Sequence, residues 1–588
     1  MRVVDAVAEW FETVGIQHYF GYAGGAIWPL LDALIDKPNI DGIQAKHESH
    51  AAHMADVYFR TTGRIAPVIV TKGPGLMNAL GGMASMMHDS SATIVITGVG
   101  STHFLGKAGM QELYYGGFDD VVALTRPISK GSWLCVRPDQ VIDVLNTALK
   151  VATSGRPGPV FVGIPYDIQL AEVEGEIEHV SRRSSASRLR AGAGEIDAVA
   201  RLVASAEKPV LLAGGGVTRS PGAVEALERL VDRLQIPVAT TLPAKGAISE
   251  EHPFSLGPVG RSGTFAAARA MREADVVVAV GARFSDNHTG NWRNGMIYDI
   301  PRTKIVQVDI DPNEIGRNYP VEQGVVSDAA TFLDDLAAAA GDGGGHAGWL
   351  AQTQGYRAEW REEIKAVIEA PQSPVHPGRL CYEVAEALPS DGHVLIDVGD
   401  VIQYAEPYMT IRHPGRWHIN SGMAEMGWAT QGAPAIPVAH PGSSAVVLTG
   451  DGAFLMGPQV IATAIEYDLP VVWVILNNNE LGIERKGSFN SYQRVHPWVS
   501  FTRRDTGQPY NPDFAALARS FGAEGRRVER TEDLRAAITE AIASRRPYVL
   551  DVPVDASIPS YFVKGLNRGY PDKWAESYPG YGLLTVKR

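Results

Sequence analysis

The sequence predicts an α/β protein built from three doubly wound parallel-sheet domains. Its 588 residues exceed what a single hydrophobic core usually accommodates. Apolar runs of strand length alternate with amphipathic helical segments along most of the chain, a pattern typical of doubly wound sheets. Two polar, glycine-rich stretches interrupt this alternation and indicate linkers. We therefore expect domains at 1–180, 195–340 and 371–555, linkers at 181–194 and 341–370, and a tail at 556–588.

The first domain is expected to present a glutamate where a strand ends and a helix begins. Residues 42–45 resemble a strand, and the helix that follows starts near Glu48 and continues through Ala51, Ala52 and Ala55. A carboxylate in the first turn interacts favourably with the helix dipole. On the local pattern alone, this dipole interaction is the simpler explanation of Glu48.

The middle domain is expected to bring polar groups to one edge of its sheet. Gly214, Gly215 and Gly216 follow its first strand, and Arg283 and Asp309 follow two later strands. Such an edge can receive a dinucleotide. The glycine triplet is a weak signal by itself, and acids after strands often cap the next helix. The expected strands and helices lie at 209–212, 223–234, 237–240, 274–280 and 304–308.

The third domain carries the most informative pair of side chains. Residues 445–449 and 471–476 have the composition of buried parallel strands, with an amphipathic helix at 459–467 between them. Asp451 follows the first strand and Asn478 the second, 27 residues later (478 − 451). Both are thus expected at the ligand-binding edge of the sheet. A carboxylate, an amide oxygen and a main-chain carbonyl suit Mg²⁺ that shares diphosphate oxygens, although such residues also occur in ordinary loops.

Composition excludes several other classes of protein. The formal net charge of −13 argues against a nucleic-acid or anionic-membrane partner. Cys135 and Cys381 are the two cysteines, far apart and in apolar surroundings, so neither a disulfide framework nor a zinc site is expected. No apolar run approaches the length of a membrane helix. We expect a cytoplasmic protein.

The glycine-flanked aspartate and the double asparagine resemble the thiamine-diphosphate-binding motif. Segments 21–26, 71–75, 154–160 and 422–427 are similar, in order and spacing, to acetohydroxyacid (acetolactate) synthase, and the similarity covers residues 1–555. Thiamine chemistry needs a carboxylate that hydrogen-bonds the pyrimidine ring. The resemblance implies that Glu48 is this carboxylate.

The resemblance also implies which residues hold the cofactors. Asp451, Asn478 and the main-chain carbonyl of Glu480 would bind Mg²⁺. Met426 would support the bent shape of thiamine diphosphate, and the carbonyl of Ala424 would accept a hydrogen bond from its aminopyrimidine. Segments 256–264, 282–290 and 327–329 resemble those that contact FAD, which in this family takes no part in the net reaction. The other implied residues are Gly24, Gly25, Asn78, Val398, Gly399, Gly450 and Gly452 for thiamine diphosphate, and Gly214, Gly215, Gly216, Gly263, Thr264, Arg283, Asp309, Ile310, Asp328 and Ala329 for FAD.

Three departures from the family concern the substrate. The family's substrate-discriminating tryptophan corresponds to Gly487. Gln111 and Lys130 resemble two pocket residues, but 19 residues (130 − 111) separate them, more than the resemblance leads us to expect, and the extra stretch includes the aromatic segment 114–118. The tail resembles that of cyclohexane-1,2-dione hydrolase, and it would cover an active site or dock on a neighbouring subunit.

The function expected from these observations is carbon–carbon bond formation or cleavage next to a carbonyl. The expected substrates are pyruvate, a related 2-oxo acid or a 1,2-diketone, with Glu48, Gln111 and Lys130 as catalytic residues. The alternatives are a 1,2-dione hydrolase, a 2-oxo acid decarboxylase, or a regulatory binding protein that has kept the fold and lost the chemistry. Because the family's cofactor lies between two subunits, a homodimer or homotetramer is implied.

Overall fold

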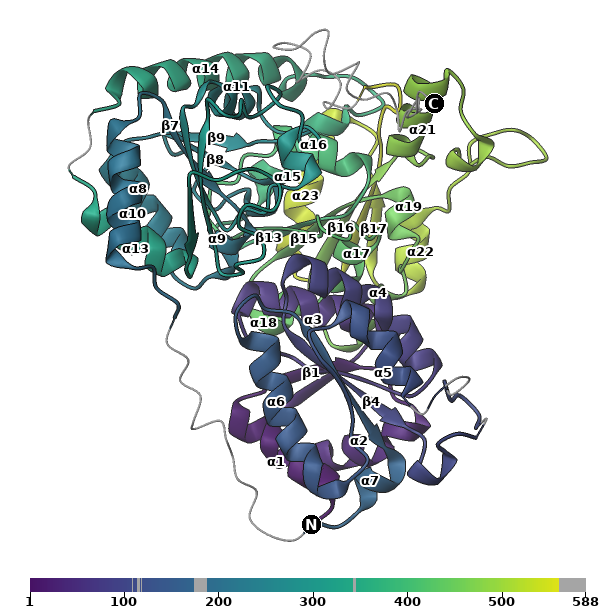
Figure 1. Cartoon of the computed structure of the whole chain (residues 1–588). Coiled ribbons are helices and arrows are strands. Elements are labelled where there is room, and N and C mark those ends of the chain that lie inside the picture. Colours follow the sequence, from purple (N-terminus) through teal and green to yellow (C-terminus); the bar gives the residue numbers. More distant parts are fainter. Residues whose placement is uncertain (108, 114–116, 118, 174–187, 342–344, 560–588) are drawn as a thin grey trace, which may run out of the picture.

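The computed structural model contains three α/β domains, each built on a six-stranded parallel sheet (Figure 1). It describes residues 1–588 except 108, 114–116, 118, 174–187, 342–344 and 560–588. The aromatic segment at 114–118, apart from Gly117, and nearly all of the expected tail lie outside the described residues. No helix among the described residues is long and apolar enough to cross a membrane.

The first domain surrounds a sheet with the strand order β2-β1-β3-β4-β6-β5. All its neighbouring strands are parallel, so every strand ends at the same edge. Its elements are α1 (Val3–Val14), β1 (His18–Gly21), α2 (Trp28–Ile35), β2 (Asp41–Gln44), α3 (Glu48–Thr62), β3 (Val68–Val70), α4 (Pro74–Asp89), β4 (Thr93–Val99), α5 (Asp120–Thr125), β5 (Ser132–Leu134), α6 (Val141–Thr153), β6 (Pro159–Pro165) and α7 (Tyr166–Leu170).

The middle domain has a different order, β12-β11-β10-β7-β8-β9. Numbered within the domain, this is 3-2-1-4-5-6 from β9 to β12, the order of dinucleotide-binding sheets. Its elements are α8 (Ala193–Ser205), β7 (Pro209–Ala213), α9 (Gly215–Arg219), α10 (Ala223–Leu234), β8 (Val238–Thr240), β9 (Ser255–Pro258), α11 (Phe265–Glu273), β10 (Val276–Val280), α12 (Asp286–Thr289), β11 (Lys304–Asp309), β12 (Gln323–Val326) and α13 (Ala329–Ala339).

The third domain repeats the order of the first, as β14-β13-β15-β16-β18-β17. Its elements are α15 (Pro377–Ala387), β13 (His393–Ile396), α16 (Asp400–Tyr408), β14 (Trp417–Ile419), α17 (Trp428–Gly432), α18 (Ala435–Ala439), β15 (Ala445–Gly450), α19 (Asp451–Phe454), α20 (Val460–Glu466), β16 (Val471–Asn477), α21 (Gly482–Tyr492), α22 (Phe514–Ser520), β17 (Glu524–Arg527), α23 (Leu534–Ala543) and β18 (Tyr548–Pro553).

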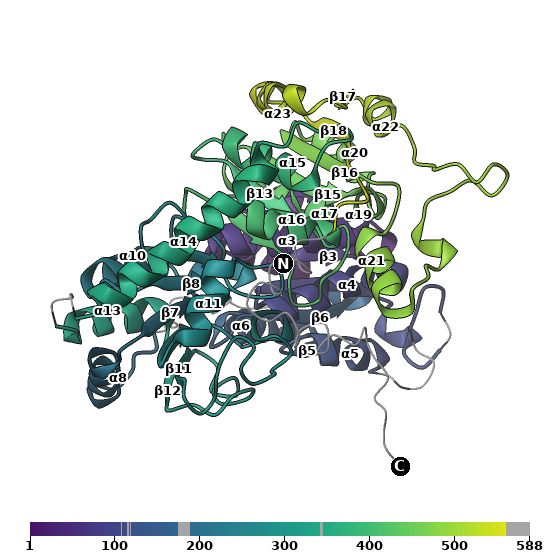
Figure 2. The ribbon, with the colours of Figure 1, turned by 90° about the horizontal axis from the view of Figure 1, so that it is seen from above.

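The segment expected as a linker at 341–370 is mostly helical, because α14 occupies Ala347–Ile368 (Figure 2). The glycines before it predicted a flexible connection and obscured the helix. Its buried side chains recur at helical spacing, so one face of α14 packs against the protein. These side chains are Trp349, Leu350, Thr353, Tyr356, Trp360 and Ile364. The helix contacts α11 of the middle domain and α15 of the third, and it joins the two domains structurally.

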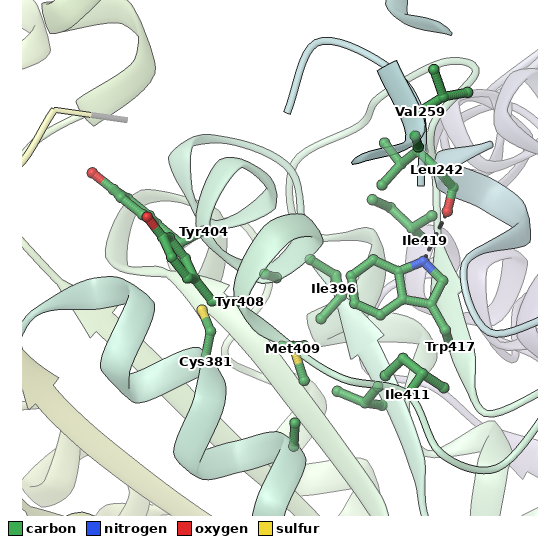
Figure 3. Packing of buried hydrophobic residues seen from close by; sticks show 14 of the residues in the cluster. Leu242, Val259, Cys381, Ile396, Tyr404, Tyr408, Met409, Ile411, Trp417 and Ile419 are labelled. Atoms are coloured by element: carbon green, nitrogen blue, oxygen red, sulfur yellow. Dashed lines mark hydrogen bonds between the residues drawn. The ribbon is translucent and has the colours of Figure 1, made fainter. Parts of the chain in front are cut away.

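The middle and third domains share a continuous hydrophobic core (Figure 3). Trp417 on β14 reaches across the boundary, and its indole N–H donates to the carbonyl of Leu242, 3.0 Å away. Ile396, Ile411 and Ile419 surround the ring on the side of the third domain. The two domains therefore form one structural unit.

The first domain contacts the third through α3. This helix is buried along most of its length, between its own sheet on one side and α17 and α18 on the other. Arg60 lies in this interface and forms ion pairs with Asp56 (2.7 Å) and Asp89 (3.0 Å). The Arg60 guanidinium also lies over the ring of Trp428, 4.6 Å from its centroid. The start of α3, where Glu48 lies, is consequently held in a fixed place.

Candidate functional site

The carboxyl edge of the third sheet gathers residues from three neighbouring strands. Asp400 follows β13, Asp451 follows β15 and Asn478 follows β16. β15 pairs with both β13 and β16, and Gly450 lies opposite Leu476 in the register. The structure therefore places Asp451 and Asn478 at adjacent strand ends, as the sequence pattern predicts.

Asp451 is buried, with 1% of its surface exposed. Its Oδ1 accepts from the backbone N–H of Gly452 (2.8 Å), and its Oδ2 accepts from the N–H of Asn479 (2.7 Å) and the side-chain amide of Asn511 (2.7 Å). Burial raises the pKa of Asp451 to about 6, and the hydrogen bonds only partly oppose that shift. Asp451 has no positively charged partner in the part of the chain that the structure describes, and a bound cation would supply one.

Asn478 and Glu480 lie in the turn that follows β16. The side-chain oxygen of Asn478 accepts from the backbone N–H of Glu480 at 3.2 Å, which fixes the amide at the sheet edge. Glu480 is 8% exposed, and one of its carboxylate oxygens pairs with Arg485 at 3.0 Å. The other carboxylate oxygen of Glu480 is buried without a hydrogen-bond partner among the described residues.

Three glycines keep this edge open to a ligand. A Cβ at Gly450 would meet no atom within 4 Å, and Gly399 has a φ of +128° that side chains rarely adopt. A Cβ at Gly452 would lie 2.8 Å from Leu481 and 3.5 Å from the methyl of Met426. Met426 therefore packs beside the Asp451 turn. Val398 and Ala424 flank the same region, and Ala424 has a φ of +55°.

The carboxyl edge of the first sheet gathers a second group around Glu48. Glu48 is 8% exposed, and its Oε2 accepts from the side-chain amide of Asn78 on α4 at 2.9 Å. The turn of Gly24 and Gly25 is linked to Glu48 through Thr71. A Cβ at Gly24 would be 2.6 Å from Thr71, and a Cβ at Gly75 would be 2.9 Å from Thr71 and 3.4 Å from Glu48. Glu48, Asn78 and the glycine turn thus form one cluster.

Gln111 lies against the start of α4. A Cβ at Gly73 would be only 2.4 Å from the carbonyl oxygen of Gln111, and Gln111 itself has a φ of +63°. The next residue, Glu112, forms an ion pair of 2.6 Å with Lys72, and its side chain is 2% exposed. This pair pins the loop to the turn that precedes α4, and it brings Gln111 close to the Glu48 cluster.

Lys130 does not join that cluster. It precedes β5, and its backbone N–H donates to the carbonyl of Pro159, the first residue of β6. The ammonium group of Lys130 donates to the carbonyl of Ser154 at 2.6 Å. Because the strands are parallel, Lys130 lies at the amino edge of the sheet, and Glu48 and Gln111 lie at the carboxyl edge. The structure separates these three predicted catalytic residues into two places.

A cavity of about 650 Å³ opens at the carboxyl edge of the middle sheet. It lies where β7 and β10 are neighbours, the point at which the strand order reverses and dinucleotides bind in such sheets. Among the predicted flavin residues it is lined by Gly215, Gly216, Arg283, Asp309, Ile310, Asp328 and Ala329.

The other predicted flavin residues lie outside the lining of this cavity and have local structural contacts. A Cβ at Gly214 would be 2.1 Å from the carbonyl oxygen of Gly281, so two chain segments approach closely there. A Cβ at Gly263 would be 2.4 Å from the carbonyl oxygen of Pro258. The hydroxyl of Thr264 caps α11 by accepting from the N–H of Ala267.

Charged side chains that lack full pairing face the cavity. The Nε of Arg219 is buried without a hydrogen-bond partner among the described residues, and burial lowers its pKa to about 10. Burial also raises the pKa of Asp309, another lining residue. An arginine in this condition is suited to a phosphate or another anionic group of a ligand. Arg156 of the first domain and Gly422 of the third complete the walls.

Residues 1–121 match the model of the thiamine pyrophosphate enzyme N-terminal TPP binding domain, residues 196–336 the central domain, and residues 397–552 the C-terminal TPP binding domain. A probable acetolactate synthase large subunit from Methanocaldococcus jannaschii is 34% identical over 572 residues, which cover 94% of this chain and 92% of that protein. The chain belongs to the acetolactate synthase family of thiamine pyrophosphate enzymes.

Two further family members have the same extent of similarity. The large subunit of acetolactate synthase isozyme 3 from Escherichia coli (strain K12) is 32% identical and covers 95% of this chain and 96% of its own length. A probable chloroplastic acetolactate synthase 2 from Oryza sativa subsp. japonica is 33% identical, and the similarity covers 94% of this chain and 82% of that protein. These matches confirm the predicted resemblance, the three α/β domains and an enzyme that depends on thiamine diphosphate.

The structure adds site residues that the sequence did not indicate. Asn511 holds Asp451 although 60 residues separate them, and Lys72 pairs with Glu112 across 40 residues. Arg219 follows the glycine triplet by three positions, and its burial against the cavity is the property that distinguishes it from a surface arginine. None of these contacts has a local sequence signal, because each depends on how separate loops meet.

Proposed function

We propose that this protein joins two carbonyl compounds through thiamine diphosphate, with pyruvate or a related 2-oxo acid or 1,2-diketone as the donor. One observation supports this most strongly. Asp451 and Asn478 end adjacent strands, while Glu48 accepts from Asn78 at the corresponding edge of the first sheet. The relatives named as acetolactate synthases agree with a carboligase.

In this proposal Asp451, Asn478 and the carbonyl of Glu480 hold Mg²⁺. The fit is chemical, because a buried carboxylate with a pKa raised to about 6 gains from a nearby cation. The open glycines Gly399 and Gly450 admit the diphosphate oxygens that share the metal. Bound thiamine diphosphate supplies a carbon nucleophile that can accept the electron pair left when a bond to the carbonyl carbon breaks.

The protein's own residues control protons and orientation in this reaction. Glu48, buried and held by Asn78, would keep a proton on the pyrimidine ring. Gln111 lies on the same edge and would hydrogen-bond the acceptor carbonyl. Lys130 is left out of this group because it lies at the opposite edge of the sheet.

The middle cavity would hold FAD. Its place at the strand-order reversal, the glycines at its wall and the unpartnered Nε of Arg219 suit a dinucleotide with a diphosphate. We assign the flavin a structural part, since Ser421 and Gly422 line the cavity and lie only a few residues before Ala424 and Met426.

We further propose that two subunits form each thiamine site. Large apolar side chains are exposed near both sheet edges, where a second subunit would cover them. In the first domain these are Trp28 (62% exposed), Met77 (47%) and Met110 (84%), and in the third they are Met423 (48%), Leu455 (40%), Met456 (57%) and Ile483 (37%). A homodimer or homotetramer would bury them.

The position corresponding to the family's tryptophan bears on the acceptor. A Cβ at Gly487 would meet no atom within 4 Å, so the space beside α21 is open. We propose that the pocket accepts a bulkier acceptor than one walled by tryptophan.

The experiment that tests the function uses the purified chain with Mg²⁺, thiamine diphosphate and FAD. It is incubated with a panel of 2-oxo acids and 1,2-diketones, alone and in pairs, and the products are identified by mass spectrometry. A carboligase gives a 2-hydroxyketone or a 2-hydroxy acid. Free aldehyde as the sole product would indicate a decarboxylase, and consumption of a diketone without an acceptor would indicate a dione hydrolase. No reaction across the panel would contradict the proposal.

A further inference from the structure

A lysine from α21 enters the edge of the third sheet at which the metal-binding residues lie. Lys486 is one helical turn beyond Gly482, and its side chain is 14% exposed. Its ammonium group donates to Asp400 Oδ2 at 2.5 Å and to the hydroxyl of Tyr404 at 2.7 Å. The hydroxyl of Tyr404 in turn donates to the carbonyl of Ile558 at 2.9 Å. Lys486 is thus held by two groups of α16.

The pair lies beside Asn478. A Cβ at Gly482 would be 2.8 Å from the Asn478 amide nitrogen and 2.8 Å from Asp400 Oδ2. Only a glycine leaves room for Asp400 and Asn478 to approach each other in this way. The ammonium group of Lys486, bonded to that same carboxylate oxygen, therefore lies at the same corner of the sheet edge as Asn478, a proposed metal ligand.

One of the two carboxylate oxygens of Asp400 lacks a hydrogen bond in the part of the chain that the structure describes. Its Oδ1 is buried without a hydrogen-bond partner among the described residues, and the side chain is 10% exposed. Asp400 is also the first residue of α16, directly after Gly399, whose left-handed backbone opens the same edge. The carboxylate oxygen itself would repel an anion, but the ammonium group of Lys486 keeps one donor free at this ligand-binding edge and can bind a further acceptor.

We propose that Lys486 is a binding residue for the diphosphate of thiamine diphosphate, preset in position by Asp400 and Tyr404. This inference rests on the proposed function. A lysine ammonium is a compact cation with three donors, two of which are engaged in the bonds described here. The third would donate to a phosphate oxygen, and the positive charge would add to that of Mg²⁺ at the same end of the cofactor.

The test measures binding and does not depend on turnover. Dissociation constants for thiamine diphosphate and for unphosphorylated thiamine are determined by quenching of intrinsic tryptophan fluorescence, in the presence of Mg²⁺. For Lys486→Met we expect the constant for thiamine diphosphate to rise about tenfold or more, because a charge-assisted hydrogen bond is lost. The constant for thiamine should stay within about twofold of the wild type, since thiamine carries no phosphate.

A double variant separates a direct contact from an indirect one. Lys486→Met leaves Asp400 as an unpaired buried carboxylate, which could itself repel the diphosphate. In Lys486→Met with Asp400→Asn that negative charge is removed as well. If Lys486 contacts the diphosphate, the double variant still binds thiamine diphosphate weakly. Recovery of wild-type affinity in the double variant would overturn the proposal.

Two more variants complete the design. Lys486→Arg keeps the charge, and we expect it to recover most of the lost affinity. Lys37→Met removes a matched ion pair, since Lys37 bonds Glu12 at 2.7 Å in the first domain, and it should leave both constants unchanged. Equal weakening of thiamine and thiamine diphosphate in Lys486→Met would indicate a general structural defect and overturn the inference. If the wild-type protein bound no thiamine diphosphate, the proposed function would itself fail.

Discussion

The first and third domains share one strand order but carry opposite charges at the same place in it. Both sheets follow the order 2-1-3-4-6-5 when their strands are numbered within the domain. The third strand of the third domain ends in buried Asp451, whereas the turn after the third strand of the first domain carries Lys72, paired with Glu112. One edge is therefore suited to a metal ion, and the other already contains its cation as a side chain.

Two sheets with the same strand order can therefore have different chemistry at the same edge. We propose that the edge with the aspartate holds Mg²⁺ and a diphosphate, whereas the edge with the lysine holds a loop and leaves Glu48 to act on protons. Breaking the two edges should therefore have different consequences. Loss of Glu48 should affect turnover, and loss of Asp451 should affect cofactor binding.

The largest effect is expected for Glu48→Gln. Because the glutamine keeps the shape and the contact to Asn78 but cannot hold the proton, kcat should fall by about 10²-fold to 10⁴-fold. The dissociation constant of thiamine diphosphate, measured by fluorescence quenching, should change little. Undiminished turnover in this variant would show that the first edge has no catalytic part.

For Asp451→Asn we expect a smaller effect, and it should fall on cofactor binding where that of Glu48→Gln falls on turnover. Removal of a metal-binding carboxylate should weaken Mg²⁺-dependent binding of thiamine diphosphate by about 100-fold. Isothermal titration calorimetry at several Mg²⁺ concentrations measures this loss. Turnover at saturating cofactor should recover in part, and a variant that bound the cofactor normally would place the metal elsewhere.

The pH dependence of Mg²⁺ binding tests the role of Asp451. Burial raises the pKa of Asp451 to about 6, so the group is protonated below that pH and binds metal poorly. Mg²⁺ affinity should fall about tenfold for each pH unit below 6. Because the pKa of Asp451 in the folded protein exceeds its ordinary value of 3.8, the metal-free protein should lose stability as the pH rises from 3.8 to about 6, and Mg²⁺ offsets that loss. An affinity independent of pH between 5 and 7 would contradict this assignment.

The smallest effect is expected at the first edge, for Lys72→Met. Loss of the pair with Glu112 frees the loop that carries Gln111, and kcat/KM should fall by about 3- to 10-fold with cofactor affinity unchanged. Hydrogen exchange of the amides at 109–113 should become faster. A charge exchange, Lys72→Glu with Glu112→Lys, should restore part of the loss, and an equal defect in the exchanged protein would exclude a role for the pair.

Features with a signal within a few neighbouring residues could be predicted from the sequence, and features that depend on distant residues could not. The strands that carry Asp451 and Asn478 were predictable, because apolar runs and glycine turns mark them within a few residues. Helix α14 was not, since the glycine run before it concealed a helical pattern. The Asp400 and Lys486 pair is separated by 86 residues, and only the folded chain brings the two together.

The placement of Lys130 shows the limit of a resemblance for individual residues. Similarity to a pocket lysine put it beside Gln111, but the register of β5 and β6 sets it at the other end of the sheet. A side chain's position depends on which end of its strand it occupies, and sequence spacing from Gln111 does not report that. The flavin residues divide in the same manner between cavity wall and structural turn.

We propose that Glu48 of one subunit and Asp451 of another complete each thiamine site. The test mixes Glu48→Gln and Asp451→Asn under conditions that exchange subunits, at a thiamine diphosphate concentration too low for Asp451→Asn alone to turn over. In a mixed dimer one site then contains intact Glu48 and intact Asp451, so activity should return to about a quarter of the wild-type level. If both residues of a site came from one chain, every site would keep a defect, and the mixture would stay as inactive as its components.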